Sequence, residues 1–175
     1  MKLYARVAAG LFDLINSSNL AIQSTDNTMS NAFEQLSVGQ IINGTPFHPT
    51  RETIREFCEA SLDFNPLHLD DDYMKGSFGK TQFGGIIMHG MNNFGVITRM
   101  LTDWLYPHGG IHRRLETRWK SPVKPGDTIT PSATITSLKT TQKGQWACLN
   151  VIVNNQKGEV VAAGEALVEF PIQIK

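Results

Sequence analysis

Three polar side chains that can bind and activate water lie within six residues of one another. Asp63, Asn65 and His68 surround Pro66 in the stretch DFNPLHLD, residues 63–70. A carboxylate and an imidazole this close can share one water molecule and move its protons. Pro66 fixes its own φ and restricts the residue before it, so the loop is stiff enough to hold both groups in one geometry. We therefore expect an acid–base pair here, with Asn65 anchoring the loop or orienting the water.

Plainer interpretations of these residues compete with this one. The motif by itself also fits an Asx turn with an incidental histidine. His68 with Asp70–Asp72 has the composition of a metal cluster, but three successive acids are better explained as the first turn of a short helix over 70–76. Gly84 and Gly85 have no preceding strand and no following Lys-Ser/Thr pair. We expect neither a metal site nor a P-loop.

The composition fits one globular domain without a dominant charge. The chain has 175 residues, with 16 Lys and Arg, 16 Asp and Glu, and a formal net charge of +0. We therefore expect no nucleic-acid partner, and we expect no membrane span because no apolar run approaches roughly 20 residues. Cys58 and Cys148 lie in apolar-periodic segments without zinc-binding spacing, so we expect buried free thiols. Free thiols fit a reducing compartment such as the cytoplasm.

The first 32 residues differ from the rest. Residues 1–18 form a short amphipathic helical pattern with early cations, which has some character of an organellar presequence. An extra docking helix or an extension is the preferred interpretation, because there are only two cations and few serines. Residues 22–31 are a polar linker. We expect an extension and linker over 1–32 and the domain over 33–175.

The order of elements within this domain predicts an α+β fold. A short strand over 39–49 precedes a helix over 51–61, which Thr50 can cap. The longest apolar-periodic segment, residues 86–106, predicts a central helix. Its apolar face consists of Ile87, Met91, Phe94, Ile97, Leu101 and Leu105.

The remainder of the chain predicts strands. Turn sequences separate four apolar or alternating segments, which are residues 111–123, 127–141, 145–155 and 158–171. Four successive strands favour an antiparallel sheet, and we expect this sheet to wrap around the long central helix.

The stretch from Phe57 to Met91 resembles the signature of the MaoC-like, (R)-specific enoyl-CoA hydratases, the hydratase 2 family. That signature is D-x-N-P-x-H followed by H-G-M, and the resemblance extends over most of residues 35–170. It implies a hotdog fold. One departure is Leu62, which stands where many relatives have glycine, and this bears on the geometry of the loop.

The resemblance also implies a function. It makes Asp63 and His68 the catalytic pair of a lyase that reversibly adds water to trans-2-enoyl-CoA and gives (R)-3-hydroxyacyl-CoA. It gives Gly90 the role of stabilising the thioester oxygen through its N–H, which fits its expected place near a helix N-terminus. Coenzyme A is then the carrier of the substrate, and no cofactor is implied. The role of His89 stays open between packing and function.

A cluster of cations is the best local patch for the phosphates of coenzyme A or of a carrier protein. It consists of Arg113, Arg114, Arg118, Lys120 and Lys124. A strand edge guarded by charge explains the same cluster. Trp104, Tyr106 and Trp119 suggest a constricted acyl pocket, although core packing explains them too.

Two other functions fit the same motifs. One is the same chemistry as a 3-hydroxyacyl-carrier-protein dehydratase of fatty-acid synthesis, and another is a non-catalytic acyl-thioester-binding hotdog. A hotdog thioesterase usually works from an acid on the central helix, and residues 86–100 contain no Asp or Glu. We expect a homodimer, because a single sheet on one helix leaves strand edges exposed and the family pairs two hotdogs.

Overall fold

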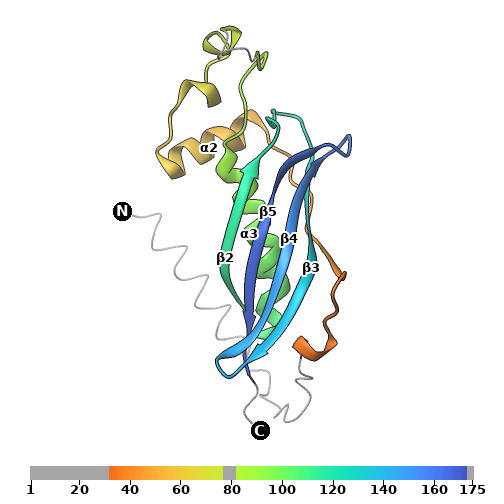
Figure 1. Ribbon diagram of the computed structural model, residues 1–175. Helices are drawn as coiled ribbons and strands as arrows, with labels where there is room; N and C mark the ends of the chain where they lie inside the picture. The colour runs from red at the N-terminus through yellow and green to blue at the C-terminus, as the bar shows by residue number, and fades with distance from the viewer. Residues whose placement is uncertain (1–31, 77–81, 173–175) are drawn as a thin grey trace, which may run out of the picture. The chain divides into compact units, whose positions relative to one another are not determined.

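The computed structural model describes residues 32–76 and 82–172 (Figure 1). The amphipathic helix expected over 1–18 and the linker over 22–31 lie outside the described residues. No helix in the described part combines the length and the apolar character needed to cross a bilayer.

The described chain forms one long helix, one shorter helix, four single-turn helices and five strands. In chain order they are η1 Ala32–Gln35, β1 Ile41–Asn43, α2 Arg51–Ser61, η2 Pro66–His68, η3 Tyr73–Lys75, α3 Gly90–Leu105, η4 Tyr106–His108, β2 Ile111–Trp119, β3 Ile129–Thr141, β4 Gly144–Asn155 and β5 Val160–Phe170.

The five strands make one antiparallel sheet in the order β1-β3-β4-β5-β2. Helix α3 runs along one face of this sheet (Figure 1). The predicted α+β fold, an antiparallel sheet around a long helix, is confirmed. Its two outer strands are β1 and β2, so the loop that follows β2 leaves from an edge of the sheet.

The core lies between α3 and the sheet. Ile97, Leu101 and Leu105 of α3 are fully buried, as predicted, against the inward residues of the strands. In β4 the side chains alternate, so Leu149 is buried while Cys148 is exposed on the outer face. The prediction of two buried thiols is therefore right for Cys58 and wrong for Cys148. Apolar neighbours alone do not reveal which face of a strand a residue occupies.

Helix α2 begins with a capping box and ends at a non-glycine residue with positive φ. Thr50 accepts a hydrogen bond from the Thr53 N–H, and Thr53 accepts one from the Thr50 N–H. At the other end, Leu62 has φ 59° and ψ 21°, in the left-handed region. The left-handed residue ends the helix, and Asp63 follows it directly. Glycine adopts this conformation without strain, which explains why it suits position 62.

Helix α3 begins at Gly90, four residues later than predicted. The N–H of Ile87 donates to the carbonyl of Leu67, and the N–H of Met88 donates to the carbonyl of Val123. Residues 86–89 are therefore held as an extended segment by partners distant in sequence, which hydrophobic periodicity cannot detect.

Candidate active site

Three segments meet around a cavity of about 400 Å³. They are the loop after α2, the extended segment that leads into α3, and the segment that follows β2. The bonds from Ile87 to Leu67 (3.1 Å) and from Met88 to Val123 (2.7 Å) join these segments through their main chains. The structure therefore brings Asp63, His68 and Gly90 to one cavity.

His68 is buried at the end of the single turn η2. Its Nδ1 lies 2.7 Å from the carbonyl oxygen of Ile87, which can only accept, so Nδ1 carries the proton. The neutral ring then has its lone pair on Nε2. This nitrogen is the atom that can take a proton from a water in the cavity.

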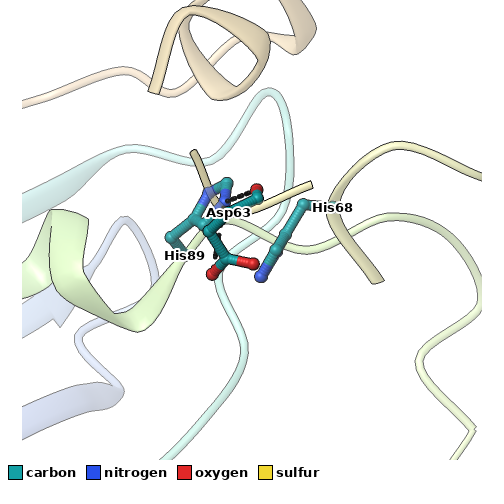
Figure 2. A group of neighbouring side chains, drawn as sticks. All are labelled: Asp63, His68 and His89. Atoms are coloured by element: carbon teal, nitrogen blue, oxygen red, sulfur yellow. Dashed lines mark hydrogen bonds and ion pairs between the residues drawn. The ribbon is translucent and has the colours of Figure 1, made fainter. Parts of the chain in front are cut away.

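Asp63 lies beside His68, with about half of its side chain exposed (Figure 2). Its Oδ1 accepts the N–H of Asn65 at 3.2 Å, and Asn65 Oδ1 in turn accepts the N–H of Leu67 at 3.1 Å. Asn65 thus anchors the turn, which is one of the two roles expected for it. Each side chain fixes the next part of the loop, so the carboxylate and the imidazole keep their separation.

His89 is buried beneath this pair and is 2% exposed. Its Nε2–H donates to the backbone oxygen of Asp63 at 3.2 Å, and Cys58 Sγ lies 3.6 Å from the same nitrogen. Burial lowers the pKa of His89, and the neighbouring His68 adds to this, while the Asp63 carbonyl and carboxylate act in the opposite direction. The ring is therefore neutral at pH 7. The structure places His89 against both Asp63 and His68.

Asp63, His68 and His89 each bring a potential ligand atom within 4.8 Å of the others. This spacing suits a single bound water, and it is also compatible with a metal ion. Asp70, which was considered as a ligand, instead accepts the N–H groups of Asp72 and Tyr73 at the start of η3.

Gly90 is the first residue of α3, so its N–H has no acceptor within the helix. The indole of Trp119 covers this residue, and its Nε1–H donates to the carbonyl of Gly90 at 2.7 Å. A Cβ on residue 90 would lie 2.6 Å from Trp119 Cε2. The close approach of the indole therefore favours glycine at this position.

Of the three aromatic residues that suggested an acyl pocket, only Trp119 lines the cavity. Trp104 packs edge-on against Phe170 in the core, and Tyr106 is 82% exposed.

The five predicted cations are not brought together within one chain. Lys120 lines the cavity, and it shares a second hollow on the outer face of the sheet with Arg118. Lys124 Nζ lies near Gly84. Arg113 forms an ion pair with Glu169. Arg113 and Arg114 lie near the start of β2, whereas Trp119 ends it. At the rise per residue of a β-strand, Arg113 is roughly 20 Å from Trp119.

Sequence reasoning missed Asn93, which also lines the cavity. It precedes Ile97, Leu101 and Leu105 at intervals of four residues, so it occupies the first position of the buried stripe of α3. A polar residue on an apolar stripe is the signal that identifies it. Ile87 and Met91, which were predicted to face the core, line the cavity instead.

The profile of the MaoC like domain matches residues 34–156. An (R)-specific enoyl-CoA hydratase of Rhodospirillum rubrum is 32% identical over 153 residues, covering 85% of this chain and 97% of that protein. The chain belongs to the MaoC-like family.

Other MaoC-like relatives agree. A 3-hydroxybutyryl-CoA dehydratase of Methylorubrum extorquens is 29% identical, with 66% of this chain and 69% of that protein covered. The solved (R)-hydratase from Aeromonas caviae, described as involved in PHA biosynthesis, superposes with a TM-score of 0.68 at 30% identity, covering 79% of this chain and 99% of that one. The sheet and helix are the hotdog fold of this MaoC-like group.

Proposed function

We propose that the protein is a lyase that reversibly adds water to trans-2-enoyl-CoA and gives (R)-3-hydroxyacyl-CoA. The observation that carries the proposal is the hydrogen bond from His68 Nδ1–H to the Ile87 carbonyl. It leaves the Nε2 lone pair available beside the Asp63 carboxylate, in the cavity that Gly90 borders. The names of the hydratase and dehydratase relatives support the same reaction.

The proposed reaction gives each of these groups a role. Asp63 and His68 bind a water between them and remove one of its protons as its oxygen bonds to the β-carbon. The electrons of the double bond move toward the thioester oxygen, where the Gly90 N–H and the positive end of α3 stabilise the negative charge. The pair then delivers the proton to the α-carbon, so both hydrogens of the water end in the product. The proposed cycle uses neither a metal nor a redox cofactor.

We propose that Lys120 and Lys124 contact the coenzyme A of the substrate bound in the same chain. Arg118, near the end of β2, is a further candidate. Lys120 supports this because it lies in the wall of the cavity. We propose that the protein is a homodimer and that the partner chain supplies further cations, including Arg113 and Arg114. Sedimentation at working concentration, with activity measured on dilution, tests the dimer, and a fully active monomer would contradict it.

A carrier-protein dehydratase remains the second candidate, since the cavity residues serve either thioester. The non-catalytic alternative required Leu62 to displace Asp63, but Asp63 and His68 lie within reach of one water. We also propose a cytoplasmic location, because Cys58 and Cys148 are both free thiols.

The direct test is hydration of enoyl-CoA esters of increasing chain length, followed as loss of the conjugated-thioester absorbance. Chiral analysis of the product from crotonyl-CoA should give the (R)-alcohol. A mainly (S) product would contradict the proposed (R) stereochemistry. Activity only on carrier-bound enoyl chains would move the proposal to the second candidate.

A further inference from the structure

The side-chain oxygen of Asn93 is buried without a hydrogen-bond partner among the described residues. Asn93 is 3% exposed, and its Oδ1 has no partner among the residues that the structure describes. Buried polar groups are nearly always hydrogen-bonded, so an unpaired amide oxygen on a residue that lines a cavity indicates a polar ligand.

Asn93 lies one turn of α3 beyond Gly90, whose N–H is the proposed partner of the thioester oxygen. Asn93 follows Gly90 by three residues, one turn of α3, and helical side chains lean toward the N-terminus of their helix. The amide therefore lies over the turn that carries the Gly90 N–H.

The cavity has an exposed side and a buried side. Lys120 and Ser121 are exposed, whereas Met88, Val123 and Asn93 are almost fully buried. A thioester held at Gly90, with its charged coenzyme on the exposed side, directs its acyl chain to the buried side. Asn93 then borders the acyl chain.

We propose that Asn93 binds a hydrogen-bonding group carried by the acyl chain, so that the preferred substrates are 2-enoyl thioesters with a hydroxyl or similar polar group beyond the reacting carbons. A hydrocarbon chain would leave the buried oxygen unpaired, whereas a hydroxyl can donate to this oxygen or accept from the amide NH₂. Sites built to hydrogen-bond a substrate group discriminate strongly against analogues that lack the group. The inference rests on the proposed function, since it takes an acyl thioester as the ligand.

Binding of saturated esters tests the inference without turnover. Calorimetry would compare pentanoyl-CoA with its 4-hydroxy and 5-hydroxy derivatives on the wild-type chain, on Asn93→Leu and on Asn92→Leu. Asn92 is the matched control, because it is the next residue of α3 and lines a different hollow. We expect wild type and Asn92→Leu to bind at least one hydroxylated ester about tenfold or more tightly than pentanoyl-CoA. Asn93→Leu should lose or reverse that preference.

Equal affinity of the wild type for all three esters, failure to bind any of them, or an unchanged preference in Asn93→Leu would overturn the inference. Thermal unfolding separates ligand binding from a structural role. Asn93→Leu should be at least as stable as wild type, because leucine replaces an unpaired buried amide. A preference lost together with a large loss of stability would contradict the proposed role.

The corresponding 2-enoyl esters separate this inference from the proposed function. If the hydroxylated esters bind with the expected preference and none of the enoyl esters is hydrated, the hydratase proposal fails and the role of Asn93 stands. If all are hydrated and bound without preference, the hydratase proposal stands and the role of Asn93 fails.

Discussion

The imidazole rings of His68 and His89 are stacked, with their centroids 3.6 Å apart and their planes inclined by 23°. Phe57 packs against His89 at a centroid distance of 4.7 Å. The proposed base is thus supported by a neutral ring that also holds the backbone of Asp63. A positive charge on His89 would lie directly against the ring of His68, so the stacked arrangement disfavours protonation of His89.

His89 is expected to make stability depend on pH. Because burial lowers its pKa in the folded protein, the unfolded chain binds more protons once the pH falls below about 6.5. The free energy of unfolding should therefore decrease as the pH falls through that value toward the lower pKa of the folded state. We expect His89→Gln to lose less stability than wild type between about pH 7.5 and about pH 5.5, measured by urea unfolding.

His112 should contribute to the same pH dependence from outside the cavity. Burial lowers its pKa too, and it lies near the far end of β2 from the cavity. His112→Gln should reduce the pH dependence of stability and leave the rate of hydration unchanged. An equal loss of stability with acid in wild type and His89→Gln would contradict the assignment of the effect to His89.

Replacing either member of the proposed acid–base pair should remove most activity. We expect Asp63→Asn and His68→Gln each to lower kcat by about 100-fold or more, because each removes a proton-transfer group. Asn65→Ala should lower it less, since Asn65 holds the turn through one hydrogen bond to the N–H of Leu67. The measurement is the rate of crotonyl-CoA hydration, with circular dichroism to confirm folding.

Exposed residues of the same types provide matched controls for this prediction. Asp72→Asn and His108→Gln change groups that do not line the cavity, so both should retain full activity. Near-native turnover by Asp63→Asn would show that the water is activated elsewhere.

Gly90 and Trp119 should be energetically coupled. A methyl group at residue 90 would overlap the indole, so Gly90→Ala should either displace the ring or destabilise the fold by about 1–3 kcal/mol. Trp119→Ala removes the obstacle and also the hydrogen bond to the Gly90 carbonyl. In a double-mutant cycle of stability, adding Trp119→Ala should reduce the penalty of Gly90→Ala. Strictly additive effects would show that the ring does not limit residue 90.

Leu62→Gly should stabilise the protein. A non-glycine residue in the left-handed region is strained by roughly 1–2 kcal/mol, and the flexibility of glycine in the unfolded chain offsets part of this. We expect a net gain of about 1 kcal/mol in urea unfolding. Ser61→Gly, one residue earlier within α2, is the matched control and should destabilise. A loss of stability in Leu62→Gly would mean that the exposed leucine makes a contact that outweighs its backbone strain.

Much of the fold follows from local patterns in the sequence. The Thr50 cap, the buried stripe of α3 and the turns between strands depend on residues close together in the chain, so they could be predicted. Residues 86–89 could not, because their N–H groups bond to segments that only folding brings near. Closeness in sequence does not show how far apart the five cations lie, since an extended strand separates Arg113 from Lys120. Asp63, His68 and Gly90 were predicted from specific motifs, and the structure brings them to one cavity. Asn93 belongs to no motif, and its place on the apolar stripe gains meaning only from its burial and its unpaired oxygen.

The carbonyl of Ile87 accepts a hydrogen bond from His68 Nδ1–H, its N–H donates to Leu67, and the residue lines the cavity. The hydrogen bonds that hold His68 and Leu67 to this segment therefore do not use the side chain of residue 87. Substitutions at residue 87 can change the shape of the cavity while the main-chain hydrogen bond that holds His68 is kept. In this part of the protein, substrate range can diverge among descendants without a new catalytic apparatus having to evolve.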